Sequence, residues 1–304
     1  LLVLAGPVAS AAENHQHNQP AWKFDLRLLG FESTGHRNNM RDPGSDAAIC
    51  ISQGQVIVGF ESANDLPEPQ SEAGAKPFLI HLISLNSADG HLSSERFWAS
   101  SSPRFSLAGT ASGNVILLIV GHTVDSEESW PSRVLLLSPE LHVLAQKDLS
   151  EPQTYWTMAL SPSGRSLVLT GEQGNGLYRH QLLNIDSLEM QKEWVDQASL
   201  NGGVSDSYAL DYSLGALQKS LFSESWTTAP LKVIGRVSPL DDSSIAVTEP
   251  EKATVHIMTM AGEEAQAWPL VNQNDAVPVS PVELATSRDS KRLAMAVFYR
   301  QKDS

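Results

Sequence analysis

The sequence has a single cysteine, Cys50, among its 304 residues. One cysteine forms no intrachain disulfide, and it cannot assemble a zinc or iron-sulfur site built from thiolates. Cys50 lies in the apolar stretch of residues 47–51. We therefore expect a buried structural thiol rather than a nucleophile.

Basic residues are also scarce, since Lys and Arg total 21 against 35 Asp and Glu, for a net charge of -14. No run of Lys and Arg could release counterions from nucleic-acid phosphates, and the same deficit argues against anionic membrane surfaces. No segment approaches the roughly 18 uninterrupted apolar residues that a membrane span needs. We expect a monomer with no nucleic-acid partner and no membrane span.

What the sequence does contain is enough apolar material for a core. Hydrophobic residues make up 41% of the chain and charged residues only 18%, a balance unlike that of disordered chains. The length could hold two average domains, but single all-β domains also reach about 250 residues and propellers run longer. Most of the chain should be folded.

The N-terminus begins with an apolar run, residues 1–4, followed by a Gly-Pro pair and the tripeptide Ala-Ser-Ala that ends at Ala11. This order matches the end of a secretory signal peptide, in which an apolar core precedes a small-x-small cleavage site. We expect residues 1–11 to be its remnant and residues 12–20 to be a flexible mature N-terminus. A trimmed cytosolic N-terminus with chance alanines is the alternative. Export without disulfides favours a bacterial periplasm or medium.

From residue 47 onward the chain repeats one pattern. An apolar strand leads through a short turn of Ser, Gly, Asp, Asn or Pro into a second apolar strand, a polar loop, a third strand, another tight turn and a last strand. Such turn residues either adopt hairpin dihedrals or end a strand, so the pattern predicts antiparallel hairpins. Units start near residues 46, 103, 156, 234 and 281, with a degenerate unit around residues 208–222.

A four-stranded unit that recurs about every 40 to 55 residues is typical of β-propeller blades. The sequence therefore predicts an all-β fold: a single β-propeller domain over residues 21–304, with six or seven four-stranded blades, incomplete at the termini. Residues 22–29 also read as a strand, which we expect to close the ring with strands of residues 282–299. Because the chain lacks an initiator Met and stops after an apolar strand, we expect a fragment of a seven-bladed protein.

The stretch of residues 161–169, Ser-Pro-Ser-Gly-Arg-Ser-Leu-Val-Leu, resembles the S-P-D-G-K-x-L turn motif of YVTN-type and TolB-like bacterial propellers, with Ser163 in the usual Asp position. Weaker echoes begin at Ser238 and Ser287. Turn chemistry of this kind specifies a fold far better than a function. The resemblance implies a family of lactone hydrolases, cofactor-bearing dehydrogenases and binding scaffolds. No catalytic motif of that family is present, and the WD dipeptide pattern of eukaryotic propellers is absent.

Histidines are the main candidates for chemistry. His81, His180 and His256 fall at similar places in third strands, so three imidazoles could ring a central channel; we favour hydrogen bonding to a neighbouring strand or turn. His15 and His17 are spaced to chelate a metal, but no third ligand is close in sequence. We assign no catalytic, cofactor-binding or metal-binding residue, and no cofactor.

Two further stretches resemble ligand sites only partly. The glycine-rich residues 171–176 lack the Lys-Ser/Thr ending and the following helix of a phosphate cradle, so we expect a loop between strands. Asp241 and Asp242 lack the spacing of a calcium loop, and a solvated turn explains the pair.

Two insertions, residues 62–76 and 122–132, are candidates for recognition because long loops on a rigid sheet scaffold often bind partners. They could equally be tolerated insertions. The second carries an acidic rim and a tryptophan that could anchor a partner. The predicted partner-binding residues are Asp125, Glu127, Glu128 and Trp130.

The sequence thus favours an exported, non-enzymatic β-propeller that binds a protein, peptide or glycan partner through loops on one face. The alternative is a lactonase-like hydrolase or a quinoprotein-type oxidoreductase with its site in the central channel. Several His, Glu or Arg side chains converging in that channel would favour the enzyme.

Overall fold

A computed structural model describes most of the chain in thirteen segments. These are residues 2–3, 22–31, 47–62, 78–100, 102–121, 131–149, 156–213, 215–222, 224–233, 235–249, 254–269, 277–286 and 293–300. The chain divides into two compact units: residues 1–109 with 113–152 form the first, and residues 110–112 with 153–304 form the second.

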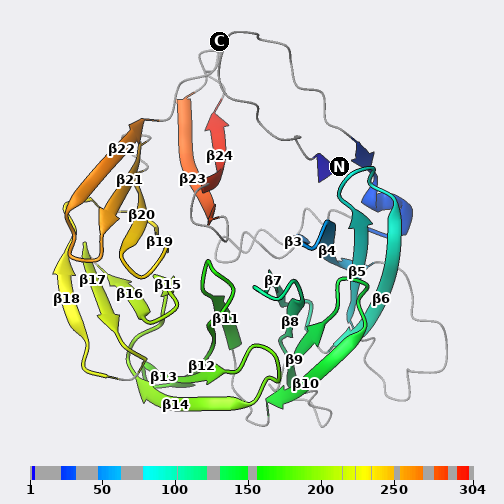
Figure 1. The fold of residues 1–304 in the computed structure, drawn as a ribbon, viewed down its shortest axis with the longest axis horizontal. Helices are drawn as coiled ribbons and strands as arrows, with labels where there is room; N and C mark the ends of the chain where they lie inside the picture. Colours follow the sequence, from blue (N-terminus) through cyan, green and yellow to red (C-terminus); the bar gives the residue numbers. More distant parts are fainter. Residues whose placement is uncertain are drawn as a thin grey trace. The chain divides into compact units, whose positions relative to one another are not determined.

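Five four-stranded antiparallel sheets follow one another along the chain, and each is built from four consecutive strands (Figure 1). We call these sheets blades 1 to 5. Blade 1 contains β3 (Ala47–Ser52), β4 (Gln55–Ser62), β5 (Phe78–Asn86) and β6 (Leu92–Ser100). Blade 2 contains β7 (Phe105–Gly109), β8 (Val115–Ile119), β9 (Ser132–Leu137) and β10 (Val143–Leu149).

The remaining three blades have the same meander topology. Blade 3 contains β11 (Trp156–Leu160), β12 (Leu167–Gly174), β13 (Leu177–Leu183) and β14 (Met190–Asp196). Blade 4 contains β15 (Gly203–Val204), β16 (Ala209–Ser213), β17 (Ala216–Ser220) and β18 (Thr227–Pro230). Blade 5 contains β19 (Val237–Pro239), β20 (Ser244–Glu249), β21 (Thr254–Thr259) and β22 (Glu264–Pro269).

Burial changes across each blade in the way that the apolar runs predict. The second and third strands hold most of the buried residues, and all five residues of β8 are inaccessible or nearly so. The fourth strands are largely exposed, as in β10, where exposed and half-buried residues alternate and only Leu149 is buried. A strand that is covered on both faces reads as a continuous apolar run, and a strand at a solvated edge does not. The two middle strands are therefore the centre of each blade's packing.

Within the first unit, blades 1 and 2 pack face to face. Ile57 and Leu82 of blade 1 share one apolar cluster with Leu117 and Leu135 of blade 2, and all four are fully buried. The first strands β3 and β7 lie next to each other. A shared core with adjacent first strands is the packing of consecutive propeller blades.

The second unit repeats this packing twice. Val168 of blade 3 shares a cluster with Ala209 of blade 4, and Leu210 of blade 4 shares another with Ile245 and Met258 of blade 5. Strand β15 is adjacent to both β11 and β19. The chain is therefore an all-β propeller of four-stranded blades, as the sequence predicts.

A sixth β unit is a two-stranded sheet of β23 (Val277–Thr286) and β24 (Leu293–Arg300). Its position matches the unit predicted near residue 281, and the degenerate unit around residues 208–222 is the complete blade 4. All six predicted units are thus confirmed as β units.

The N-terminal segment differs from the prediction of one strand over residues 22–29. Strand β2 covers only Lys23–Phe24 and pairs with β1 (Leu2–Val3), while β23 pairs with β24, so the expected ring-closing pairing is wrong for the described strands. A 3-10 helix, η1 (Leu26–Leu29), follows because the carboxylate of Asp25 accepts from the backbone N–H of Arg27 at 3.1 Å. Gly30, with φ of 86°, ends this helix.

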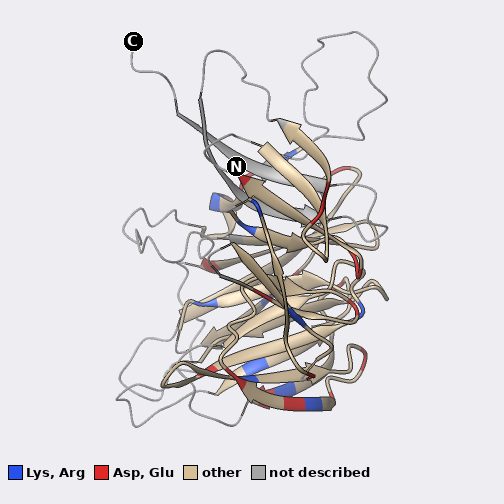
Figure 2. Cartoon of the chain, turned by 90° about the vertical axis from the view of Figure 1, so that its left-hand side faces the viewer, with Lys and Arg blue, Asp and Glu red and all other residues tan. Residues whose placement is uncertain are grey.

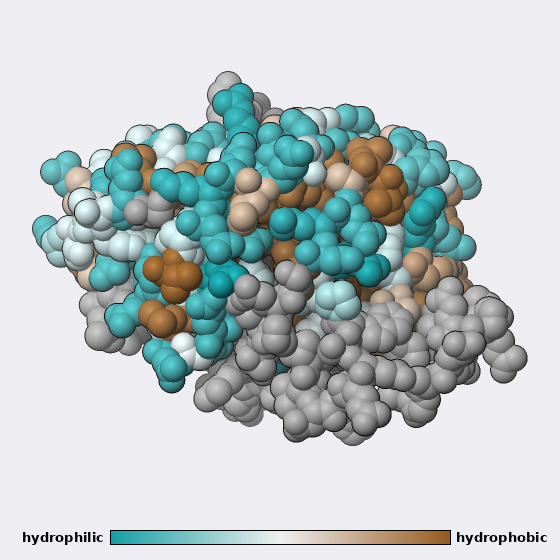
Figure 3. Space-filling view, turned by 90° about the horizontal axis from the view of Figure 1, so that it is seen from below, coloured by the Kyte–Doolittle hydropathy of each residue, from teal (hydrophilic) through white to brown (hydrophobic). Residues whose placement is uncertain are grey.

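The outer surface is mixed in charge and polarity. Figure 2 shows acidic and basic residues interspersed on the side that it displays. In Figure 3 the apolar residues of the visible, coloured surface form small spots among hydrophilic ones. No helix within the described segments is long and apolar enough to cross a membrane.

Candidate functional site

The four predicted partner-binding residues, Asp125, Glu127, Glu128 and Trp130, lie outside the described residues, as do His15 and His17. The structure does describe the base of the loop that carries the first four. The backbone N–H of Gly121 donates to the hydroxyl of Ser132 at 2.9 Å, and that of Val120 donates to the carbonyl of Arg104 at 3.0 Å. The two ends of the loop are therefore joined to each other, and the residue before Gly121 is joined to the residue that precedes β7.

The three histidines lie on the third strand of their blades: His81 on β5, His180 on β13 and His256 on β21. Neighbouring blades adjoin through their first strands. A third strand is therefore two strands away from the edge at which blades adjoin. The hypothesis that these imidazoles ring a central channel is therefore wrong. Each ring instead interacts with side chains of its own blade.

His180 has the most complete set of partners. Its Nδ1 lies 3.0 Å from the hydroxyl of Thr170, and its Nε2 lies 3.0 Å from a carboxylate oxygen of Asp196. The ring stacks on Trp194 with centroids 4.9 Å apart. Burial lowers the pKa of His180, and this effect outweighs the opposing charge of Asp196. The imidazole is therefore held neutral inside the blade.

Asp196 is the centre of this network. Besides His180, its carboxylate accepts from the indole N–H groups of Trp194 and Trp226, each at 3.1 Å, and from the backbone N–H of Ala198 at 2.8 Å. Trp226 lies in the connection between β17 and β18, so the carboxylate joins blade 3 to blade 4. Four donors to one carboxylate satisfy nearly all of its acceptor capacity.

The set of Thr170, His180 and Asp196 has the hydroxyl, imidazole and carboxylate of a hydrolase triad. Thr170 is only 5% exposed and His180 is fully buried, while Trp194 covers the ring. A nucleophile needs a path for its substrate, and these burials leave none. The arrangement is therefore a structural network.

The other two histidines differ in their partners. His256 contacts two carboxylates, Glu264 at 2.6 Å from Nδ1 and Glu249 at 3.0 Å from Nε2. His81 is buried between Phe60 and Phe97, and neither ring nitrogen has a hydrogen-bond partner within the described chain. The favoured interpretation, hydrogen bonding within the blade, is confirmed for His180 and His256, whereas His81 has only the carboxylate of Glu95 on β6, 3.4 Å from its Nε2.

The predicted aspartate turn is a link between blades. Asp242, in the β19–β20 turn, accepts from the backbone N–H of Ser207 at 2.9 Å and from its hydroxyl at 2.6 Å. The neighbouring Asp206 in turn accepts from the hydroxyl of Ser163, a residue of the S-P-S-G turn. Burial acts to raise the pKa of Asp242, but hydrogen bonds from serines outweigh it and lower the pKa. No group of three metal-ligating side chains is present in the described segments.

The glycine-rich residues 171–176 belong mainly to β12, which continues to Gly174 and turns into β13 at residues 175 and 176. The predicted loop between strands is therefore only a tight turn. Asn175 and Gly176 both have positive φ, 54° and 72°, as such a hairpin turn requires.

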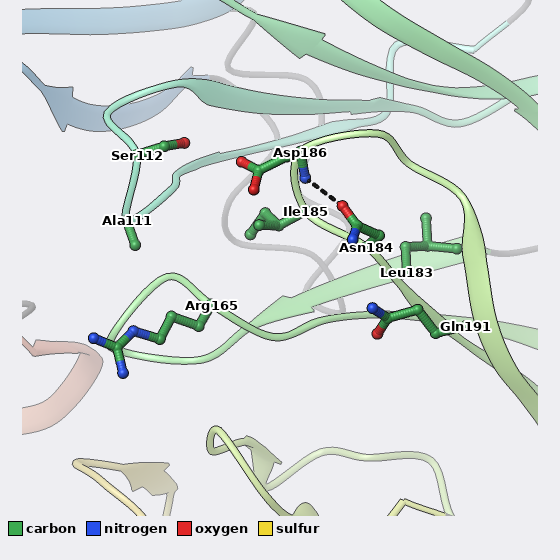
Figure 4. A pocket seen from close by; sticks show the side chains of 8 residues that line it. All are labelled: Ala111, Ser112, Arg165, Leu183, Asn184, Ile185, Asp186 and Gln191. Carbon is green, nitrogen blue, oxygen red and sulfur yellow. Dashed lines mark hydrogen bonds between the residues drawn. The ribbon is translucent and has the colours of Figure 1, made fainter.

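A pocket of about 490 Å³ lies within the second unit, at the turns that end the first and third strands (Figure 4). One wall is the turn that contains Ala111 and Ser112, which belongs to this unit, and another is the β11–β12 turn with Arg165. The β13–β14 turn and its flanks complete the lining with Leu183, Asn184, Ile185, Asp186 and Gln191.

The backbone of these turns is fixed. The N–H of Ala111 donates to the carbonyl of Gly164 at 2.9 Å, and a Cβ on Gly164, whose φ is +75°, would lie 2.5 Å from that nitrogen. The side-chain oxygen of Asn184 accepts from the backbone N–H groups of Asp186 at 2.9 Å and Ser187 at 3.1 Å. The pocket is thus bordered by turns that already have their hydrogen bonds.

Sequence reasoning missed this pocket. Arg165 is the last residue of the S-P-S-G-R motif, but that motif predicts only a turn and assigns no function to the arginine side chain. Asp186 and Ser112 come from turns far away in sequence, and only the folded chain brings them to the same cavity (Figure 4).

Comparison with known proteins shows no family for the chain, only similarity to solved propeller structures. No family model matches the chain, and no curated protein matches it. A catalytically inactive virginiamycin B lyase from Staphylococcus aureus, solved with quinupristin, is 14% identical over 84% of this chain and 85% of its own, with a TM-score of 0.47.

Two further solved structures are similar to a comparable degree. The propeller domain of the trilobed protease from Pyrococcus furiosus is 10% identical over 83% of this chain and 79% of its own, with a TM-score of 0.47. The periplasmic gluconolactonase of Pseudomonas aeruginosa is 16% identical over 72% of both chains, with a TM-score of 0.45. All three TM-scores are below 0.5, so we carry no function over from these structures, and the assignment of the propeller fold rests on the chain's own four-stranded blades.

Proposed function

We propose that the protein is an exported, non-enzymatic propeller that binds a protein, peptide or glycan partner through the loop of residues 122–132. The observation that supports this most is the closed base of the loop, where Gly121 bonds to Ser132 at 2.9 Å. The loop follows β8, whose residues are all buried. A loop on a rigid base loses less conformational freedom when it binds a partner.

The contacts of the histidines also support a scaffold over an enzyme. Both nitrogens of His180 and both of His256 are engaged by side chains of the same blade. Both rings are also buried, with His180 at 0% and His256 at 8% exposure, whereas a general acid or base must come within hydrogen-bond reach of its substrate. We accordingly propose that binding, rather than catalysis, takes place at the loops.

The experiment selects ligands on the wild-type protein from a displayed peptide library and a glycan array, then measures their affinity for variants. We expect Trp130→Ala to weaken the selected ligands at least about tenfold, since aromatic anchors carry much of an interface's energy. The matched control is Trp268→Ala, which removes a tryptophan that is 41% exposed on β22.

A second variant, Asp125→Asn with Glu127→Gln and Glu128→Gln, tests the acidic rim and should slow association more than it speeds dissociation. Equal affinity of wild type and Trp130→Ala would contradict the choice of site. Saturable stabilisation by a lactone or a quinone cofactor in a thermal-shift screen would favour the enzyme instead.

Export has its own test. When the gene is expressed in a bacterium, we expect the mature protein in the periplasm or medium to begin at Ala12, as read by mass spectrometry of the N-terminal peptide. Accumulation in the cytoplasm with residues 1–11 attached would contradict export.

A further inference from the structure

Two asparagines in the sequence are followed by glycine, Asn175 and Asn201, and both are exposed residues at turns. In such a pair the backbone nitrogen of the glycine can attack the side-chain carbonyl carbon of the asparagine, since glycine has no side chain to hinder the approach. By sequence alone the two pairs are therefore equally reactive. Neither lies in the proposed partner loop, so their chemistry is independent of the proposed function.

Asn201 is held in place by its neighbours. Its side-chain amide donates to the carbonyl of Tyr212 at 2.8 Å and accepts from the backbone N–H of Tyr212 at 2.7 Å. Gly202 is buried, and a Cβ built on it would lie 3.1 Å from atoms of Leu210. Attack by the nitrogen of Gly202 requires the Asn201 side chain to turn toward that nitrogen, so both bonds to Tyr212 must first break.

Asn175 and Gly176 form the tip of the β12–β13 hairpin, where no such restraint is present. The side chain of Asn175 has no hydrogen-bond partner within the described part of the chain. A Cβ built on Gly174 or Gly176 would meet no atom within 4 Å apart from those of adjoining residues. The tip can therefore move without disturbing packed side chains, and segments of this kind open at the lowest free-energy cost in a folded protein.

Local opening sets the rate of attack at either asparagine. A cyclic imide forms only when the glycine nitrogen and the asparagine Cγ lie on the same side of the asparagine Cα–C bond. The closed hairpin turn, with φ of 54° at Asn175 and 72° at Gly176, must open to allow this rotation. At Asn201 the two bonds to Tyr212 must break as well, and two bonds of ordinary strength lower the open population at least about tenfold.

We propose that Asn175 is a site of spontaneous deamidation in the folded protein and that the fold protects Asn201. In the opened tip the nitrogen of Gly176 forms a bond to Cγ of Asn175 and gives its proton to the solvent. The Cγ–Nδ2 bond breaks, and the leaving nitrogen takes a proton from the solvent and departs as ammonia. One water then opens the imide at either carbonyl carbon, which yields aspartate or isoaspartate and adds one negative charge to the tip.

The test follows both asparagines in one sample of the full chain. The folded protein is incubated at mildly alkaline pH, and timed samples are digested with trypsin, which separates Asn175 on residues 166–179 from Asn201 on residues 193–219. Mass spectrometry measures the exchange of the amide for a carboxyl group, and chromatography separates the aspartyl product from the isoaspartyl product. We expect residues 166–179 to convert at least about tenfold faster than residues 193–219.

The matched control is the same chain in urea, where both turns are unfolded and the two rates should converge. Asn175→Gln is a second control, because its longer side chain would have to close a six-membered ring, which forms far more slowly. This variant should abolish the conversion of residues 166–179 and leave that of residues 193–219 unchanged. Its unchanged urea denaturation verifies that the fold is intact.

Two outcomes overturn the proposal. Equal rates for Asn175 and Asn201 in the folded chain, or a faster rate for Asn201, would show that the bonds to Tyr212 do not protect. An unreacted Asn175 in the folded chain, after a time in which the chain in urea has converted completely, would show that the closed hairpin tip is itself protective.

Discussion

His180 and His81 occupy the same place in two blades and have opposite surroundings. Each lies on a third strand, faces an aromatic residue of the fourth strand and is almost completely buried. His180 is bonded at both nitrogens by Thr170 and Asp196, whereas both nitrogens of His81 lack a hydrogen bond within the described chain.

The difference comes from the neighbouring strands. Opposite His180, β12 supplies the hydroxyl of Thr170; opposite His81, β4 supplies the ring of Phe60. The carboxylate of Glu95 lies 3.4 Å from Nε2 of His81 and is half exposed. A repeated residue therefore keeps its place in the blade while its chemistry depends on what the adjacent strands provide.

The largest effect is expected from removing the carboxylate of Asp196, which is hydrogen-bonded to His180 in blade 3. Asp196→Ala leaves the donors of His180, Trp194 and Trp226 without their acceptor. We expect a loss of about 3 kcal/mol in the free energy of unfolding, measured by urea denaturation, because unsatisfied buried donors are costly. Asp196→Asn retains one acceptor oxygen and should lose about half as much. A loss below about 1 kcal/mol for the alanine variant would mean that water replaces the carboxylate.

A matched pair of substitutions separates the two histidines. His180→Leu removes two hydrogen bonds and leaves Thr170 and Asp196 without them, so we expect a loss of about 2 kcal/mol. His81→Leu replaces a ring without hydrogen bonds by an apolar side chain and should change stability by less than about 1 kcal/mol. Equal losses from urea denaturation of both variants would show that ring packing, not hydrogen bonding, sets the cost.

Much of the fold could be predicted because blade turns have a local chemistry. The S-P-S-G turn owes its shape to Ser161, whose hydroxyl accepts from the backbone N–H groups of Arg165 and Ser166, and to Gly164 at a positive φ. Those residues are adjacent in sequence, so their pattern marks the turn wherever it occurs. Blade 4 was predicted differently, from the gap between the units near residues 156 and 234, which is longer than one blade.

The N-terminal error was also local in origin. Residues 22–29 alternate enough to resemble a strand, but Asp25 before the apolar turn and Gly30 after it are the cap residues of a short helix. The prediction of a strand followed the alternation of apolar and polar residues and overlooked these two cap residues. Trp22 then packs against blade 1, with its indole N–H donating to the carbonyl of Ser87 at 2.9 Å.

The site features could not be predicted because they join distant segments. Asp196 meets Trp226, which lies 30 residues later in another blade, and no spacing rule links them. The pocket unites three turns for the same reason. Sequence periodicity predicts which residues are buried, but it does not predict which side chain of one blade meets which of the next.

The pH dependence of the free energy of unfolding is a further test of the comparison between His180 and His81, and it is the smallest of the expected effects. Burial lowers the pKa of both His180 and His81 below the ordinary value of 6.5, so the unfolded chain takes up protons before the folded chain does. The contribution of these two histidines to the free energy of unfolding is fully present above pH 6.5. It is lost as the pH falls below 6.5, by at most about 1.4 kcal/mol per histidine per pH unit.

Lowered pKa values of Asp241 and Asp242 act only below about pH 4, so the interval between pH 6.5 and 5 reports on histidines. We expect the free energy of unfolding of the wild type to fall across this interval, and that of the double variant His81→Leu with His180→Leu to fall less steeply. His81→Leu alone should flatten the decline while leaving stability at pH 7.5 nearly unchanged, because burial lowers the pKa of its ring and its one polar contact is the half-exposed Glu95 at 3.4 Å. If His81→Leu changes the free energy of unfolding equally at every pH, and so leaves its pH dependence unchanged, then His81 has the same pKa in the folded and unfolded chains. That result would contradict the lowered pKa of the buried ring.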